Sequence, residues 1–213
     1  TAFKENMVED LIITLAKDIR LKQKRLGGRK LLDLINPLLA ESEQIGRDAF
    51  FDLLRRRGML VRKRKWRAYT TNSFHWLRKY PNLIKEMDCH WPNQLWVSDI
   101  TYIKTASGFV YLFLITDAYS RKIVGWQMSE TLESKNALQA LYMAISQLPA
   151  NVKNLIHHSD RGIQYCSSQY VSCLQKHTIG ISMTENGDPY ENAIAERVNG
   201  ILKTEWLYDI KLK

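Results

Sequence analysis

The sequence predicts an α/β protein, in which a mixed five-stranded sheet with flanking helices follows an all-α region. Two observations predict this class. Apolar residues recur at helical spacing in the first third of the chain, whereas residues 95–128 hold three runs rich in β-branched and aromatic residues. After residue 128, helical and strand-like segments alternate, which is typical of parallel strands joined by helices.

Three helices are expected in the all-α region: from about Val8 to before Gly27, from Arg29 to Leu38 and from Arg47 to Arg57. Asn36-Pro37 should interrupt the second helix, because proline cannot continue a helix. Gly58 occupies the position of a C-cap glycine after the third helix. The second and third helices have the outline of a helix-turn-helix, although any small helical bundle has a similar outline.

The positive charge of the chain lies in its first part. The formal net charge is +9; residues 1–92 hold 20 Lys and Arg against 11 Asp and Glu, and residues 93–213 hold 11 of each. Residues 55–67 contain eight basic residues and no acidic one. Such an arm indicates a polyanion partner, the alternative being a solvated surface. The side chains expected to contact phosphates here are Arg47, Arg55, Arg56, Arg57, Arg62, Lys63, Arg64, Lys65 and Arg67.

The predicted elements after residue 92 follow the order β-β-β-α-β-α-β-α. They cover residues 95–104, 108–116, 122–128, 134–148, 154–158, 168–176, 179–183 and 190–207. Short turns make the first three strands an antiparallel meander. This succession is that of the ribonuclease-H-like fold, with the first strand central and the fourth beside it. The predicted domains are a helical DNA-binding region at 1–71, a linker at 72–92 and a core at 93–213.

Composition excludes several classes of protein. Hydrophobic residues make up 45% and charged residues 25% of the chain, which excludes a disordered protein. The apolar run Phe109–Ile115 is too short to span a bilayer, and no basic-then-apolar leader opens the chain. The three cysteines, Cys89, Cys166 and Cys173, lack zinc-finger spacing and fit reduced thiols in a cytosol.

Two aspartates suggest a metal site. Asp99 lies in the middle of the apolar first strand, where a charge is costly unless it is paired or binds a cation. Asp160 ends the fourth strand, so the two neighbouring strands should bring the carboxylates side by side. A divalent metal would relieve their repulsion, and an all-oxygen site selects Mg²⁺ or Mn²⁺. The alternative is that Asp99 is an edge residue and Asp160 a helix cap.

The carboxylates belong to three ordered blocks of sequence, at residues 92–103, 157–165 and 192–205. These blocks resemble the catalytic blocks of the insertion-sequence transposases of the IS-three family, which have a retroviral-integrase type of core. Asp160 and Glu196 enclose 35 residues, the spacing of that family's Asp-Asp-Glu signature. The family also has an N-terminal helix-turn-helix, so the resemblance covers nearly the whole chain.

This resemblance implies a DNA transposase that cleaves insertion-sequence ends and joins them to target DNA. It implies two Mg²⁺ ions, replaceable by Mn²⁺, with Asp99 bridging them, Asp160 on one and Glu196 on the other. It further implies duplex DNA as the partner, a homo-multimer on DNA, no membrane, and a place in the bacterial cytoplasm with the nucleoid. Lys203, beside the site, is expected to contact phosphate. The family's helical segment beyond the glutamate helix has no counterpart before Lys213, so the chain is expected to be short at its C-terminus.

The final helix offers three glutamates: Glu191, Glu196 and Glu205. At about 100° per residue, a polar stripe within about 60° of Glu196 is formed by Asn192, Asn199 and Lys203. The opposite side is apolar and is expected to pack on the sheet through Ile194, Val198 and Ile201. Glu205 falls on that opposite side and Glu191 at the helix start. Glu196 points with the polar stripe toward Asp99 and Asp160 and is therefore the expected third catalytic carboxylate.

Other side chains and functions have simpler or weaker explanations. His157 and His158 could bind a metal, but Mg²⁺ prefers oxygen ligands. Asp117, at the end of the second strand, fits a turn-capping role better than a catalytic one. The competing functions are a DNA-binding remnant with a dead core and a nuclease that cuts RNA in hybrids. The helix-turn-helix argues against the nuclease, because A-form helices are not read by a helix in the major groove.

Overall fold

The structure is a computed structural model that describes residues 2–61, 75–85, 87–106, 108–185 and 192–207. The chain forms two compact units, one built on the N-terminal helices together with the segment from Ile201, and the other built on the sheet. Within the described residues, no helix is both long enough and apolar enough to cross a membrane.

The first unit is the predicted all-α region. Its helices are α1 (Ala2–Lys22), α2 (Gly28–Ile35) and α3 (Arg47–Arg56), with short 3₁₀ turns η1 (Asn36–Leu38) and η2 (Glu41–Glu43) between the last two. Pro37 lies at the start of η1, so the expected interruption of the second helix is confirmed. Gly58 follows α3 with a φ of 65°, the left-handed conformation that glycine adopts without strain.

The core of this unit is a cluster of aliphatic and aromatic side chains, including Ile12, Leu31, Ile35, Phe50 and Leu53. Each of them is almost fully buried, so all three helices contribute to one core. The connection between α2 and α3 spans residues 36–46 and is longer than the three- or four-residue turn of a helix-turn-helix. The three predicted helices are present. Because the connection between the last two is longer than such a turn, the helix-turn-helix remains a prediction.

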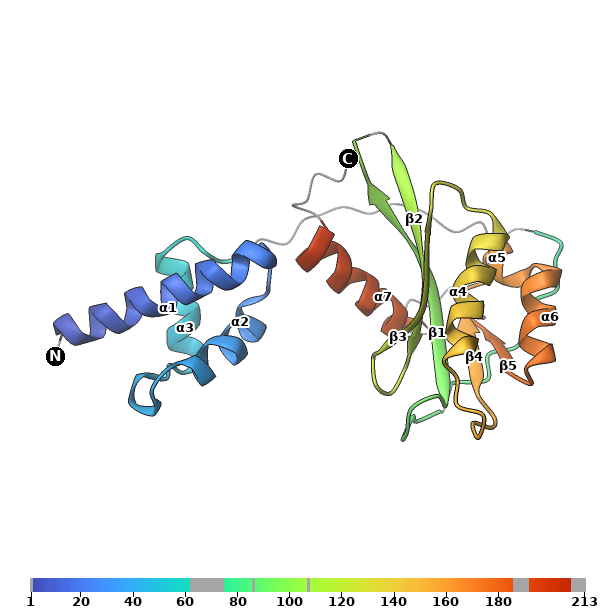
Figure 1. Cartoon of the computed structure of the whole chain (residues 1–213), viewed down its shortest axis with the longest axis horizontal. Coiled ribbons are helices and arrows are strands. Elements are labelled where there is room, and N and C mark those ends of the chain that lie inside the picture. Colours follow the sequence, from blue (N-terminus) through green and yellow to red (C-terminus); the bar gives the residue numbers. More distant parts are fainter. Residues whose placement is uncertain (1, 62–74, 86, 107, 186–191, 208–213) are drawn as a thin grey trace. The chain divides into compact units, whose positions relative to one another are not determined.

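The second unit contains one mixed sheet of five strands (Figure 1). They are β1 (Leu95–Lys104), β2 (Phe109–Asp117), β3 (Ile123–Ser129), β4 (Ile156–Ser159) and β5 (Gly180–Met183). Their order is β3-β2-β1-β4-β5; the first three strands pair antiparallel, and β4 and β5 join in parallel. The predicted fold class is thereby confirmed, with β1 central and β4 beside it.

Helices cover the two faces of this sheet. One face carries α4 (Ser134–Ser146), α5 (Ile163–Cys166) and α6 (Ser168–Lys176), and the other carries α7 (Ala193–Ile201) (Figure 1). Alternation along β1 divides its side chains: Trp96 and Ile100 pack with the α4 cluster, whereas Leu95 and Val97 pack with α7. Asp99 shares the face of Leu95 and Val97, so the alternation turns it toward α7.

The segment expected to be a linker packs on the sheet unit where it is described. Met183 N–H donates to the Pro81 carbonyl at 3.3 Å, and Leu83 N–H donates to Ser182 Oγ at 2.9 Å. Ile84 and Met87 pack against the small apolar cluster of Leu95 and Val97. The reason is that β5 is an edge strand, whose unpaired backbone groups and neighbouring apolar surface accept an extended segment.

Gly125 is required by the close approach of β3 to α4. A Cβ at this position would collide with the Ala140 carbonyl oxygen and meet Ala144 Cβ at 3.0 Å. Gly125→Ala is therefore expected to lower the unfolding free energy of the sheet unit by about 1–3 kcal/mol through overpacking. Thermal denaturation measures this loss. Gly180→Ala is the control, since its nearest atom would lie at an ordinary 3.4 Å; an equal loss in both variants would contradict the packing argument.

Candidate active site

Asp99 and Asp160 come from the two central parallel strands. Leu95 pairs with Ile156 and Val97 with His158, so the same register continued by two residues sets Asp160 opposite Asp99. Asp160 Oδ1 accepts the Gly162 N–H at 2.9 Å, which fixes the carboxylate at the end of β4. The structure thus brings the first two predicted site residues together.

Two asparagines join α7 to β1, one just before the helix begins and one within it. Asn192 Nδ2 donates to the Ser98 carbonyl at 3.1 Å, and Asn199 Nδ2 donates to Asp99 Oδ2 at 2.5 Å. Both side chains are buried, with exposed fractions of 6% for Asn192 and 5% for Asn199. Glu196 lies between them in the sequence and is exposed. Glu196 therefore lies on the segment that these two bonds attach to β1, and its side chain faces solvent.

The electrostatics of the site centre on Asp99. Burial, together with the charge of Asp160 and a smaller contribution from Glu196, raises its pKa to about 7. Hydrogen bonds from Asn199 and from the Ile100 N–H act in the opposite direction. Burial also raises the pKa of Glu196. The ionised form of Asp99 is thus disfavoured, as expected where a cation is needed to hold neighbouring carboxylates together.

The donor chemistry of these residues fits a hard divalent cation. Asp99, Asp160 and Glu196 offer only oxygen, which is what Mg²⁺ and Mn²⁺ prefer. In the part of the chain that the structure describes, no three His, Cys, Asp or Glu side chains stand close enough together to hold a metal ion. The fit therefore rests on Asp99 and Asp160, and Glu196 would have to turn inward from its exposed position to join them.

A buried polar network joins β1, β4, β5 and α6 next to the strand ends that carry the two carboxylates. His157 Nε2 is 2.6 Å from Ser98 Oγ and 2.9 Å from Tyr170 Oη, and burial lowers the pKa of His157 to about 3. His158 Nδ1 is 2.8 Å from Ser182 Oγ. Both imidazoles are buried within the sheet unit.

Asp117 occupies the turn-capping position that its sequence context suggested. Its Oδ1 accepts from the Ser120 N–H at 2.7 Å and from Ser120 Oγ at 2.6 Å, and its Oδ2 accepts from the Asn93 N–H at 2.6 Å. These bonds tie the end of β2 to the start of β1. Both of its carboxylate oxygens thereby accept hydrogen bonds from neighbouring turn residues.

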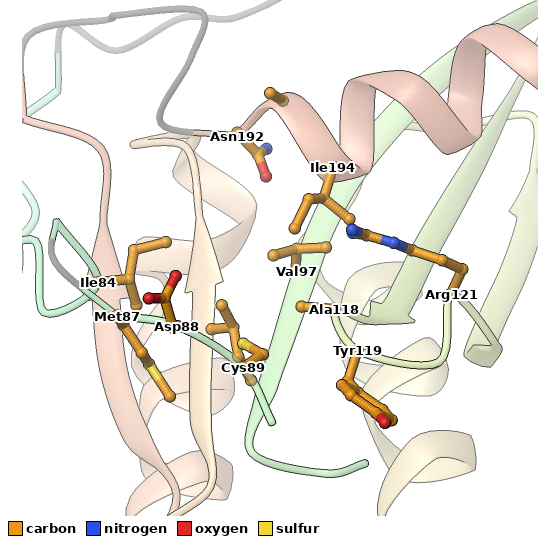
Figure 2. A pocket seen from close by; sticks show the side chains of 12 residues that line it. Ile84, Met87, Asp88, Cys89, Val97, Ala118, Tyr119, Arg121, Asn192 and Ile194 are labelled. Carbon is orange, nitrogen blue, oxygen red and sulfur yellow. The ribbon is translucent and has the colours of Figure 1, made fainter. Parts of the chain in front are cut away.

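A pocket of about 400 Å³ opens on the face of β1 that carries Asp99 (Figure 2). Val97 and Ala118 line it on the sheet side, Asn192 lines it from just before α7, and Ile194 lines it from the first turn of α7 (Figure 2). Arg121 stands on the far side from Met87, Asp88 and Cys89 (Figure 2).

The orientation of α7 corrects one prediction. The segment buries Asn192, Ala195 and Asn199 against the sheet, and only Ile194 of the expected apolar stripe packs in the cluster there. Val198 and Ile201 are only partly buried. Asn192 and Asn199 belong to the polar stripe that was predicted to face Asp99, and they turn inward because they bond to Ser98 and Asp99. Glu196 of the same stripe is exposed.

The final helix is also shorter than predicted. It begins at Ala193, and after Ile201 it gives way to a π-helical turn, η3 (Leu202–Leu207). A π turn holds more residues than an α-helical turn, so the angular position predicted for Lys203 does not apply. Glu205 lies in the same turn and pairs with Lys30 Nζ at 2.9 Å. Glu191 lies outside the described residues.

The basic residues predicted to contact DNA divide into two groups. The four arginines of this set that the structure describes each pair with an acidic side chain: Arg47 with Asp48, Arg55 with Asp52, Arg56 with Glu9 and Arg57 with Asp10. Such exposed pairs contribute little to stability, so a phosphate can replace the carboxylate at small cost. The second group, Arg62, Lys63, Arg64, Lys65 and Arg67, lies outside the described residues.

Sequence reasoning did not assign a role to Asn192, Asn199 or Tyr170. Helical spacing puts the two asparagines on the same side of the helix as Glu196, and this pattern in the sequence points to a shared surface. It does not identify the partners of their side chains. The partner of Tyr170 is His157 on β4, and no local pattern links the two.

The family model described as Integrase core domain matches residues 90–189. Transposase InsF for insertion sequence IS3A of Escherichia coli K12 is 34% identical over 197 residues, covering 92% of this chain and 67% of that protein. A putative transposase for the element IS986/IS6110 of Mycobacterium tuberculosis is 42% identical over 118 residues. That match covers 54% of this chain and spans 42% of the length of the mycobacterial protein.

Solved structures with a similar chain path include the catalytic core domain of HTLV-2 integrase in complex with magnesium. It is 25% identical with a TM-score of 0.43, over 53% of this chain and 68% of that one. A simian T-cell lymphotropic virus intasome in complex with a PP2A regulatory subunit is 19% identical with a TM-score of 0.49, over 89% of this chain and 58% of that one.

Proposed function

The chain belongs to the IS-three family of insertion-sequence transposases with an integrase core domain, and from this membership we propose that it cleaves element ends and joins them to target DNA. The observation that carries the proposal is the meeting of Asp99 and Asp160 on adjacent parallel strands, with α7 bonded to Asp99. Keeping two carboxylates together at a site that raises the pKa of one of them is costly for folding, which favours a catalytic role.

The residues that would hold the divalent ions, Mg²⁺ or Mn²⁺ and two in number, are Asp99, Asp160 and Glu196. When bound, the ions supply an activated attacking oxygen and a stabilised leaving oxygen. Water breaks the phosphodiester at the element end and leaves a 3′-hydroxyl, which then attacks a target phosphodiester and displaces its 3′-oxygen. Both steps exchange one P–O bond for another, so no covalent enzyme intermediate is required.

DNA binding is proposed to rest on the helical region at residues 1–71, with the core at 93–213 supplying the chemistry. The support is the charge distribution, which puts the whole excess of +9 before residue 93. Exposed arginines on α3 and the basic run that follows would contact phosphates, and Lys203 would do so near the core. The partner is duplex DNA, engaged by a homo-multimer in the bacterial cytoplasm, because two element ends must be held together.

The basic run is expected to determine the salt dependence of binding. Replacing Arg62, Lys63, Arg64, Lys65 and Arg67 together by glutamine should weaken DNA binding and flatten the plot of log affinity against log salt, by about 0.9 for each phosphate that the protein no longer neutralises. Fluorescence anisotropy over a range of about 50 to 200 mM salt would measure both. Glutamine replacements at Lys122, Lys153 and Lys176 in the core serve as the control. An equal effect there would contradict the proposal that the helical region at residues 1–71 binds the DNA.

A cleavage assay on a labelled element end tests the proposed function. Mg²⁺ or Mn²⁺ should support nicking, whereas Ca²⁺ should permit binding with little chemistry. Nicking that continues undiminished in excess chelator would refute the metal mechanism. Binding without any nicking in Mg²⁺ would instead indicate a protein that only binds DNA.

A further inference from the structure

The attachment of α7 to the sheet depends on few apolar contacts. Ala195 is its only apolar side chain among the described residues that is almost fully buried, and its methyl group contributes little burial energy. A pocket of about 400 Å³ adjoins the start of the helix (Figure 2), where Ile194 is only partly buried against the cluster of Leu95 and Val97. Buried polar contacts supplement these few apolar ones in setting where the helix, and with it Glu196, stands relative to β1.

Asn192 makes two of these contacts at once. Its backbone carbonyl accepts the Glu196 N–H at 3.1 Å, a bond of the helical ladder at this end. Its side-chain Nδ2 donates to the Ser98 carbonyl at 3.1 Å, and the Ser98 carbonyl belongs to the peptide that leads into Asp99. A continuous path of two hydrogen bonds thus joins the backbone of Glu196 to the backbone of Asp99.

The side chain of Asn192 is not what stability alone would select. It is 6% exposed, and its Oδ1 has no hydrogen-bond partner among the described residues. Burying an unsatisfied amide oxygen is unfavourable, and an apolar side chain of similar size would avoid that cost. Asn199 makes the second contact on the same helical face, seven residues later, directly to Asp99 Oδ2.

We propose that Asn192 is a positioning residue, which fastens the start of α7 to β1 and thereby holds Glu196 within reach of Asp99. This role rests on the proposed function, because it concerns the carboxylates that would bind metal. Asn192 does not contact the reacting atoms. It acts through Glu196, whose exposed side chain then needs only to turn, while its backbone is already placed.

The test compares Asn192→Leu with Asn136→Leu in the full chain. Asn136 is a matched control, because it is also 6% exposed and its Nδ2 donates to the Thr131 carbonyl at 3.0 Å, at the start of α4. Both variants remove a buried amide that donates to a backbone carbonyl, and Asn192→Leu also removes an oxygen without a described partner, so its melting temperature should not fall below that of Asn136→Leu. Only Asn192→Leu should lower kcat for cleavage, by roughly 10- to 100-fold, with KM for DNA unchanged.

Two further measurements separate positioning from a structural role. Mn²⁺ affinity of the protein without DNA should fall about 10-fold in Asn192→Leu and stay unchanged in Asn136→Leu. In a Glu196→Gln background, Asn192→Leu should cause no further loss of residual cleavage, since it acts through Glu196. Asn192→Gln, which keeps the amide donor, should restore part of the loss.

An effect on KM rather than kcat, an unchanged Mn²⁺ affinity, or additive losses with Glu196→Gln would overturn the positioning role. If the wild-type chain nicks no element end while Mn²⁺ binding still falls only in Asn192→Leu, the proposed function fails and the positioning role stands. If the wild type nicks and Asn192→Leu matches it in rate and in Mn²⁺ affinity, the positioning role fails alone.

Discussion

Asp99→Asn is expected to abolish cleavage while stabilising the metal-free protein at neutral pH. The catalytic loss should be at least about 10³-fold, because bound metal supplies several kcal/mol of transition-state stabilisation and the bridging ligand would be gone. DNA binding should persist, since the excess positive charge lies before residue 93. Cleavage of a labelled element end and anisotropy with the same DNA measure the two effects.

The gain in stability follows from the direction of the pKa shift. Burial and Asp160 raise the pKa of Asp99 from 3.8 to about 7, so between these values the folded chain keeps a proton that the unfolded chain releases. The unfolding free energy therefore falls as pH rises from about 4 to 7 and levels off above. Asparagine carries no such charge. The unfolding free energy of Asp99→Asn should therefore equal that of the wild type near pH 4 and exceed it by on the order of 2–4 kcal/mol at pH 8.

Urea denaturation at about pH 4 and pH 8, in excess chelator, measures this difference. Glu130→Gln, at an exposed position, is the control and should change neither curve. Saturating Mn²⁺ should reverse the order of stability at the higher pH, because only the wild type offers the full carboxylate set. An Asp99→Asn protein that cleaves at the wild-type rate, or is less stable than wild type at the higher pH without metal, would contradict the assignment.

Glu196→Gln is expected to remove cleavage and strand transfer, whereas Glu205→Gln keeps most of both. Glu196 stands between two asparagines that bond to the Ser98 carbonyl and to Asp99, so its backbone is aligned with the carboxylate pair. Glu205 lies in the π-helical turn and pairs with Lys30 of the N-terminal unit, to which the segment from Ile201 also belongs. The loss at Glu196 should be about 10³-fold, as for a metal ligand.

The decisive measurement is the rate of cleavage, side by side for Glu196→Gln, Glu205→Gln and Glu191→Gln. Circular dichroism and melting temperature check that each variant is folded. Glu205→Gln should lose only the ion pair with Lys30, a small effect on stability. A folded Glu205→Gln enzyme without activity, or a Glu196→Gln enzyme at nearly the wild-type rate, would overturn the choice of third carboxylate.

Local sequence patterns were sufficient for much of the fold. Residues 95–104 were predicted as a strand and form β1 with the same bounds, because β-branched and aromatic residues between turn signals determine a strand locally. α6 likewise has its predicted bounds, Ser168–Lys176. The short connections between the first strands favoured an antiparallel meander. The succession of strands and helices after it predicted the ribonuclease-H-like fold, in which β1 is central.

Elements whose form depends on distant partners were less predictable. Residues 81–83 carry no strand pattern, yet Pro81 and Leu83 bond to the edge strand β5, which has polar groups without a strand partner on that side. The end of α7 changes to a π-helical turn at Leu202, which nothing in the apolar spacing signals.

The sequence by itself determined the order of the elements, the central strand and the placement of Asp99 and Asp160 on neighbouring strands. The elements follow from alternation and turn chemistry, which are local, and the neighbouring strands follow from the succession of elements along the chain. The angular spacing of the final helix also predicted that its polar stripe faces Asp99. Only the tertiary structure decided which members of that stripe are buried: Asn192 and Asn199 turn inward, whereas Glu196 stays exposed. Hydrogen bonds from Asn192 and Asn199 to groups about a hundred residues away hold these two side chains inward, because buried donors must find acceptors and these lie on β1.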